Sequence, residues 1–288
     1  MKKIFKYIFA GMAAMSVVAC SEDALETSPS SSVSGNELLG TATNALVSLN
    51  GVYRAMYTAG VSNSSNTHQC FGITAYNLVA DVMGEDCIMN GQGSGWFWYD
   101  CVYNVKSRYT STGWRSYDMW NGYYTWISNV NYILAEEETM SGSETEKNYV
   151  LGQAYAVRAY SYFMLAQMFS RTYKGHESEP CVPLYTEPTD IATEGKGRAT
   201  VEEVYLDKAI TMLGNSGKRK HISHINEAVA SGIKARVALV MEDWQTALDA
   251  ANAAISKSGC SIGTGTAVTG GMNDATANNV MWAAEIIA

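Results

Sequence analysis

The side chains best suited to binding chemistry are four aromatic residues in one short segment. The segment from Gly93 to Asp100 contains the run Trp96-Phe97-Trp98-Tyr99 between glycines and an acid. Flat aromatic faces stack on the apolar C–H faces of sugar rings, while amides and carboxylates bind the sugar hydroxyls. We therefore predict that Trp96, Trp98 and Tyr99 form a stacking surface. The alternative is a hydrophobic plug beneath a long loop.

Acidic residues lie close to this segment. Asp81, Glu85 and Asp86 precede it, with Asn77 and Asn90 to either side. We predict that Asp81 and Asp86 contribute a hydrogen-bonding rim to the same site. Carboxylate and amide oxygens also suit a hard cation, so an oxygen-rich cation site is a second interpretation and a solvated loop is a third.

Two more aromatic residues, Trp114 and Tyr117, can extend this surface. Tyr117 stands at the start of a predicted helix, so we expect it to pack against the core instead. The prediction for the site includes no metal ion and no cofactor.

No residue pattern supports catalysis. Glycoside hydrolysis needs two carboxylates at a defined separation, but Glu136, Glu137 and Glu138 stand at the end of a polar helix, where solvated charge is expected. His221 and His224 are spaced to share a helix face, yet no third metal ligand accompanies them. The sequence contains no GxSxG, HExxH or phosphate-binding loop. We predict that the protein is not an enzyme.

The N-terminus is typical of an exported protein. Three lysines precede an apolar run from Ile8 to Ala19. This run has about a dozen residues, fewer than the roughly 20 that a membrane-spanning helix needs. We predict that residues 1–19 form a signal peptide that is removed. Val17 to Cys20 resembles a bacterial lipobox, which makes Cys20 the predicted lipid anchor; the alternative is an ordinary signal peptide with a chance cysteine.

Composition indicates a globular, acidic protein behind a flexible start. The formal net charge is -8 and hydrophobic residues make up 47% of the chain, so nucleic acid is not an expected partner. Residues 20–40 are expected to be the lipidated cysteine and a Ser-, Thr- and Gly-rich tether. We assign no disulfides and expect the cysteines after Cys20 to be small buried hydrophobes. These are Cys70, Cys87, Cys101, Cys181 and Cys260.

Apolar residues repeat at three- and four-residue steps in several segments, which predicts core-facing helices. The stripes run from Leu46 to Met56, from Trp120 to Leu134, from Leu151 to Phe169, from Ile225 to Leu239 and from Trp244 to Ile255. A shorter helix from Glu202 to Leu213 is expected to start with a capping box formed by Thr200 and Glu203.

The first two helices after Trp120 are expected to form one hairpin, and the two helices after Ile225 a second. Small residues line the contact within the second hairpin, as in a tetratricopeptide unit. We therefore predict a mainly helical fold of stacked hairpins for residues 41–288. Residues from Val61 to Arg115 are expected to form loops and short strands, and residues from Ser256 to Asn279 are expected to be loose. The apolar end, from Val280 to Ala288, suggests a missing continuation that would cover it.

The segment from Gly152 to Leu165, GQAYAVRAYSYFML, resembles the signature helix of SusD/RagB proteins, and Pro183-Leu184 follows as in that family. The segments Leu49 to Tyr53, Trp120 to Asn131 and Arg198 to Tyr205 are similar to the family in order and spacing. The longer connection from Ser170 to Val182 departs from the pattern.

The resemblance implies a stack of tetratricopeptide-like hairpins, about half of a full-length member, and therefore a missing C-terminal part. It also implies a surface lipoprotein that binds oligosaccharides, or in some members peptides, beside a SusC-type TonB-dependent transporter. Residues 21–23, Ser-Glu-Asp, resemble a signal for display outside the outer membrane. A helical-repeat scaffold without a small ligand is the alternative from another class.

Overall fold

The computed structural model describes residues 38–84, 87–102, 113–200, 207–265, 269–271 and 274–284. The chain divides into two units, Met1–Leu38 and Leu39–Ala288, and the elements below belong to the second. Cys20, the predicted signal peptide and most of the predicted tether lie outside the described residues.

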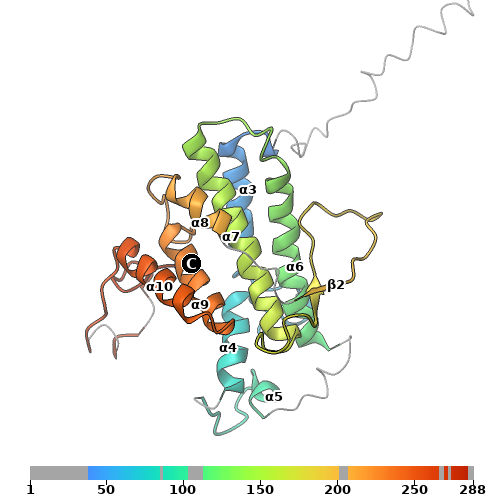
Figure 1. The fold of residues 1–288 in the computed structure, drawn as a ribbon. Helices are drawn as coiled ribbons and strands as arrows, with labels where there is room; N and C mark the ends of the chain where they lie inside the picture. Colours follow the sequence, from blue (N-terminus) through green and yellow to red (C-terminus); the bar gives the residue numbers. More distant parts are fainter. Residues whose placement is uncertain are drawn as a thin grey trace, which may run out of the picture. The chain divides into compact units, whose positions relative to one another are not determined.

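The second unit is mainly helical, which confirms the predicted fold class (Figure 1). Its longer helices are α3 (Ala42–Ala55), α4 (Ile73–Met83), α6 (Trp114–Ala135), α7 (Glu144–Phe169), α8 (Asp207–Gly214), α9 (Glu227–Val240) and α10 (Trp244–Ser258). Short helices are η2 (Ser64–Asn66) and α5 (Trp98–Cys101). Strands β1 (Pro180–Pro183) and β2 (Arg198–Thr200) pair antiparallel, a small sheet that the sequence patterns do not predict.

Helix α7 lies at the centre of the core. It contacts α3, α6, α8, α9 and β1, and Figure 1 shows α3, α6 and α7 running side by side. The capping box of Ser143 and Glu146 starts the helix. The sequence predicts one buried stripe, but α7 is buried on nearly every side between Tyr149 and Leu165. Burial follows the whole circumference because neighbouring elements surround this helix.

Helices α9 and α10 form the second predicted hairpin, and alanines fill its seam. The buried seam residues are Ala235, Ala238, Ala247, Ala250 and Ala254. Small side chains let helix axes approach closely. The predicted stripes are confirmed at Ile225 and Val229, which are buried, but they are wrong for four large residues that are exposed: Leu239, Trp244, Leu248 and Ile255. On α10 these large residues are four and seven positions apart and occupy a different face from the alanines.

The prediction of loops between Val61 and Arg115 is also wrong, because this region contains α4 and α5. Only Ala75, Tyr76 and Val79 of α4 are buried, which makes a short stripe in a helix of only 11 residues. Gly72 stands at the N-cap and supplies no side-chain cap, so the usual start signal is missing from the sequence.

The structure tests the predicted capping box before α8 and the predicted burial of the cysteines only in part. Thr200 is the last residue of β2, while residues 201–206 lie outside the described part, so the capping box before α8 stays a prediction. Cys70 and Cys181 are buried, as expected of small hydrophobes, but Cys87 is exposed. Among the described residues, no helix is long and apolar enough to cross a membrane.

Close packing of α7 against α8 explains a glycine in the signature helix. A Cβ atom at Gly152 would lie 2.9 Å from Leu213 Cγ and 3.0 Å from Met212 Cβ. We predict that Gly152→Ala lowers the free energy of unfolding by up to about 2 kcal/mol, because overpacking costs about 1–3 kcal/mol and the gain in helix propensity offsets only about 1 kcal/mol of it.

Urea denaturation measures this effect, and Gly51→Ala is the matched control. Gly51 lies in α3, and a Cβ there would meet nothing within 4 Å. This control should be neutral or slightly stabilising. Equal effects of the two substitutions would contradict a packing role for Gly152.

Candidate functional site

Of the predicted stacking residues, Trp96 lies in the turn before α5, and Trp98 and Tyr99 are the first two residues of α5. The backbone turns sharply there, with positive φ angles of 50° at Gly93, 84° at Gly95 and 56° at Phe97. Trp96 is 49% exposed and Tyr99 is 59% exposed, whereas Trp98 is half-buried. Two of the three predicted residues therefore present aromatic surface to solvent.

Phe97 is the residue that acts as a hydrophobic plug. Its side chain is buried, its ring meets Phe71 edge-on at 6.2 Å between centroids, and its backbone N–H donates to Gln69 Oε1 at 2.9 Å. A bulky residue in the left-handed region costs about 1–3 kcal/mol and persists only where its surroundings hold it. These contacts hold the turn that carries Trp96 and Trp98.

A buried ion pair anchors the same turn to α6. The Nη2 atom of Arg115 lies 3.1 Å from Asp100 Oδ2, and both side chains are almost fully buried. Arg115 Nη1 also donates to the carbonyl of Gln69 at 2.8 Å, and its guanidinium lies 5.0 Å from the Phe97 ring centroid. Burial lowers the pKa of Arg115 to about 10, which keeps it protonated at neutral pH. One cation thus joins the loop before α4, the aromatic turn and α6.

A second buried polar cluster lies one helical turn further along α6. Ser62 Oγ donates to the Asp118 carboxylate, and Tyr76 Oη donates to the Asp118 carbonyl at 3.0 Å. Burial raises the pKa of Asp118, and it raises the pKa of the Cys70 thiol to about 12. Because Cys70 stays protonated, it is a poor nucleophile. These groups fix the loop before α4 onto α6.

Sequence reasoning missed His68, which lies beside Trp96. Their ring centroids are 5.4 Å apart, with 44° between the ring planes. His68 is exposed and stands in the loop after η2, 28 positions before Trp96. Only an Asn-, Ser- and Thr-rich composition marks that loop, and no spacing rule connects it to the aromatic segment. His68 adds a hydrogen-bonding group next to the exposed indole.

The predicted acidic rim lies only partly within the described residues. Asp81 is exposed on α4, which packs beside α5, and Asn77 is exposed one turn earlier on the same helix. Glu85 and Asp86 lie outside the described residues. Within the described part of the chain, no three His, Cys, Asp or Glu side chains are grouped to hold a metal ion.

The two aromatic residues at the start of α6 differ from expectation. Tyr117 is 52% exposed, so the prediction that it packs against the core is wrong. The first turn of α6 exposes this position, while Arg115 and Asp118 face inward. Trp114 is half-buried, with the Arg115 guanidinium 4.2 Å from its ring centroid.

The carboxylates considered for hydrolysis have structural partners. Tyr155 Oη donates to Glu137 Oε2 at 2.5 Å, and Thr139 Oγ1 donates to Glu136 Oε2 at 2.6 Å. Glu138 is exposed. These contacts fit the interpretation of ordinary charges at the end of a helix.

The two histidines do not form a pair of ligands on a helix face. His224 is buried and hydrogen-bonds to Tyr149 Oη at 2.6 Å and to Asn50 Oδ1 at 2.8 Å, whereas His221 is exposed. Burial, reinforced by the charges of His221, Lys220 and Arg219, lowers the pKa of His224 to about 4. The neutral ring links α3 and α7 to the connection before α9.

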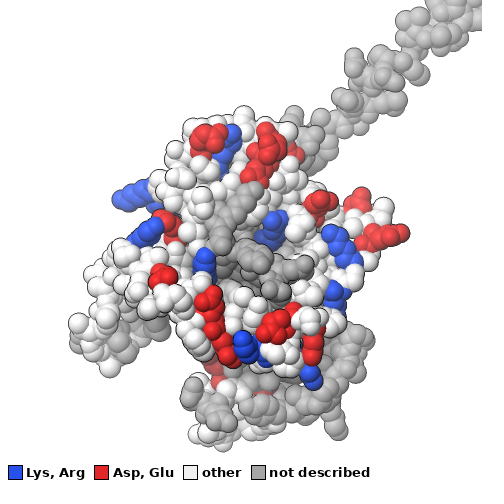
Figure 2. Space-filling view, in the orientation of Figure 1, with Lys and Arg blue, Asp and Glu red and all other residues white. Residues whose placement is uncertain are grey.

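Three hollows of about 310, 610 and 260 Å³ occur elsewhere in the described part of the chain. Trp96, Trp98 and Tyr99 line none of these three. In the face that Figure 2 shows, acidic and basic side chains are interspersed. The aromatic segment is therefore the candidate site on grounds of exposure and chemistry rather than of cavity size.

A family model described as SusD-like, starch-binding and associating with the outer membrane matches residues 42–239. No curated protein matches the chain. Among solved structures, a SusD-like carbohydrate-binding protein from Bacteroides vulgatus shows 24% identity and a TM-score of 0.72, with 84% of this chain and 50% of that chain covered.

Two further structures have the same fold. A putative sugar-binding protein from Bacteroides vulgatus shows 24% identity and a TM-score of 0.60, with 78% of this chain and 48% of that one covered. A laminarin-binding SusD-like protein shows 19% identity and a TM-score of 0.52, with 76% and 44% covered. The chain spans about half the length of the structures it matches.

Proposed function

Because this chain belongs to the SusD-like family, we propose that it captures oligosaccharides at the cell surface and delivers them to a SusC-type TonB-dependent transporter. SusD-like proteins are binding proteins rather than enzymes. The single observation that carries the proposal for this chain is the exposure of Trp96 and Tyr99 on a turn held by buried contacts.

The geometry suits stacking in two ways. An indole or phenol face already exposed to solvent need not move to meet a sugar ring, so little conformational entropy is lost on binding. The buried Arg115–Asp100 pair and the Phe97 ring support that face from below. His68 and Asp81 supply polar groups near the same segment, and Asp86 is proposed to complete the rim.

The N-terminal sequence and the family description support a proposed location. We propose that Cys20 is lipidated and anchors the protein in the outer membrane, facing outside, with residues 21–40 as a tether. The family description, which includes association with the outer membrane, supports this location. A tethered receptor raises the local concentration of ligand beside a transporter without any covalent chemistry.

A binding screen tests the proposed ligand class. The protein, without its signal peptide, is offered a panel of neutral oligosaccharides and a panel of short peptides, and binding is measured by calorimetry. We expect binding of oligosaccharides of one linkage class. Binding of peptides alone would overturn the proposal in favour of peptide capture, and binding of neither would favour a scaffold.

The same binding assay measures the effect of removing the stacking rings. Trp96→Ala and Trp98→Ala should each weaken oligosaccharide binding about fivefold or more, because a stacked ring contributes about 1 kcal/mol. Trp244→Ala is the matched control, since Trp244 is also exposed but lies on α10. An equal loss in the control variant would show that the effect does not come from the aromatic segment.

A further inference from the structure

A second surface feature lies away from the aromatic segment, between the ends of three helices. A hollow of about 610 Å³ is bordered by the end of α8, the connection to α9, the first turn of α9 and the end of α10. Its charged lining residues are Lys218, Arg219, Lys220, Glu227 and Lys257, with His221 beside them. We call this feature the basic hollow.

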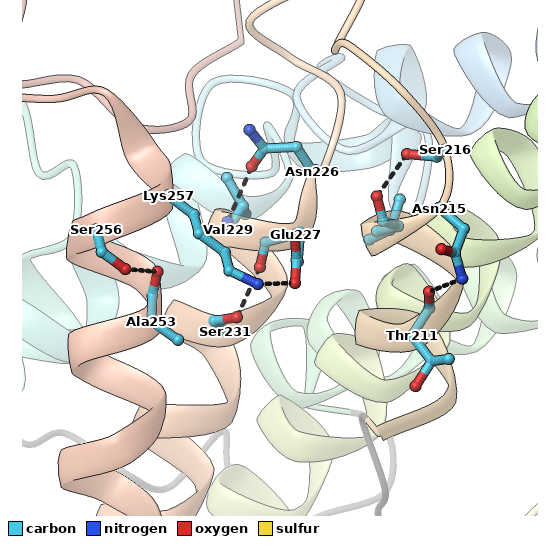
Figure 3. Close-up of polar contacts among 11 residues, drawn as sticks. Thr211, Asn215, Ser216, Asn226, Glu227, Val229, Ser231, Ala253, Ser256 and Lys257 are labelled. Carbon is cyan, nitrogen blue, oxygen red and sulfur yellow. Dashed lines mark hydrogen bonds and ion pairs between the residues drawn. The ribbon is translucent and has the colours of Figure 1, made fainter.

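The only carboxylate among these lining residues is already neutralised. Figure 3 shows Glu227, at the start of α9, paired with Lys257 from the last turn of α10. Lys257 therefore has a structural role, since it joins the two helices of the hairpin. The other cations of the basic hollow are three consecutive residues, Lys218, Arg219 and Lys220.

None of these three cations forms an ion pair within 4.0 Å with a carboxylate of the described residues. Arg219 Nη1 donates to the carbonyl of Met281 at 2.7 Å, and the Lys220 ammonium lies 5.2 Å from the Tyr149 ring centroid. Glu146 on α7 acts on Lys220 only from a longer distance. Lys218 is exposed. The basic hollow thus keeps a net positive charge.

This positive charge is opposite in sign to the net charge of the whole chain. The chain carries a formal net charge of -8. The charges of Lys220 and Arg219 also contribute to the lowered pKa of the neighbouring His224, so their field reaches into the protein. Clustered cations around a concave surface attract anions and form strong, charge-assisted hydrogen bonds with carboxylate or sulfate oxygens.

We propose that the basic hollow binds the carboxylate or sulfate groups of an acidic polysaccharide. Its volume of about 610 Å³ falls within the range of about 300–1,000 Å³ that is usual for ligand sites, so it has room for a charged sugar unit. The saccharide part of this inference rests on the proposed function, whereas the preference for anions rests on the hollow alone.

The test uses polysaccharides of known charge. Binding of dextran sulfate, polygalacturonate and neutral dextran is compared on the protein without its signal peptide, with inorganic sulfate as the bare anion. We expect dextran sulfate or polygalacturonate to bind, and which of the two binds better identifies sulfate or carboxylate. Raising NaCl from about 0.1 to about 1 M shortens the screening length from about 10 to about 3 Å and should abolish this binding.

Charge reversal locates the site. The double variant Lys218→Glu, Lys220→Glu should weaken binding of the acidic polysaccharide about tenfold or more, because each charge-assisted contact contributes about 1.5–3 kcal/mol. The control double variant Arg54→Glu, Lys174→Glu changes the net charge equally at exposed positions that do not line the hollow. It should bind within about twofold of the unchanged protein, as expected for screened charges outside the site.

Three results would overturn the proposal: no binding of either acidic polysaccharide, equal losses in the two double variants, or inorganic sulfate as the only ligand. Thermal unfolding of each variant shows that its fold is intact. Neutral oligosaccharide binding should survive the Lys218→Glu, Lys220→Glu change. Failure of the basic hollow is thereby separable from failure of the aromatic site.

Discussion

Replacement of Arg115 by methionine is expected to lower the free energy of unfolding by about 3–5 kcal/mol, the usual cost of breaking a buried ion pair from one side. The substitution removes the 3.1 Å contact with Asp100 and the donor to the Gln69 carbonyl. Asp100 is buried, so water cannot replace the lost ion pair. Urea denaturation of the two proteins measures the difference.

The exposed ion pair of Arg171 and Glu179 provides the control. These side chains are 68% and 42% exposed at a separation of 3.2 Å. Arg171→Met should cost less than about 1 kcal/mol, because solvent screens an exposed pair. A cost this small for Arg115→Met would show that the pair does not hold the aromatic turn.

Loss of Arg115 should also weaken ligand binding, although Arg115 is buried and cannot touch a sugar. The turn with Phe97 in the left-handed region depends on the guanidinium beneath it and on Gln69. Once that support is lost, Trp96 and Tyr99 must be ordered at the moment of binding, which costs entropy. Oligosaccharide affinity of Arg115→Met, measured below its unfolding transition, should fall while Arg171→Met binds as before.

Acid is expected to destabilise the protein through His224. Its Nε2–H donates to Asn50 Oδ1, which can only accept, so the neutral ring must accept at Nδ1 from Tyr149. The folded pKa of about 4 lies below the ordinary value of 6.5. The neutral form is therefore favoured by folding, and the stabilisation is complete above pH 6.5 and is lost as the pH falls toward 4.

The size of this effect follows from the pKa difference. Between pH 7.5 and pH 4.5 the protein should lose about 2.5 kcal/mol of stability from His224. Asp118 acts in the opposite direction, because burial raises its pKa and its protonation on acidification favours the folded state. The pH dependence of the free energy of unfolding of the unchanged protein therefore does not report the contribution of His224 alone.

The comparison with His224→Gln does isolate it. Glutamine can donate to Asn50 and accept from Tyr149, but it does not titrate in this range. The difference in unfolding free energy between the two proteins should shift by about 2.5 kcal/mol in favour of the variant at pH 4.5. Parallel pH profiles would mean that His224 is not held neutral in the fold.

Much of the helical framework was predictable from the sequence. The spacing of Leu49, Val52 and Tyr53 predicts α3, and equivalent stripes predict α6, α7, α9 and α10. Periodicity reports which residues are apolar, but it does not report which neighbours cover them. For this reason the stripes did not predict that α10 buries its alanines and exposes Trp244, or that α7 is buried on nearly every side between Tyr149 and Leu165.

The site was predictable only in its exposed part. Trp96 and Tyr99 follow from aromatic density between glycines, a signal within one segment. Two contacts of the site join segments that are separated in the sequence: the ion pair of Arg115 with Asp100 and the ring contact of His68 with Trp96. No local spacing rule reveals such contacts. Cys20 and Asp86 lie outside the described residues and remain predictions from sequence.

The most direct test of the central claim is a crystal structure of the protein with an oligosaccharide that the binding screen selects. We predict a sugar ring stacked on the Trp96 indole, with Tyr99 or Trp98 against a neighbouring ring and His68 within hydrogen-bonding distance of a hydroxyl. An oligosaccharide bound elsewhere, with Trp96 and Tyr99 still exposed to solvent, would contradict the assignment of this segment as the binding site.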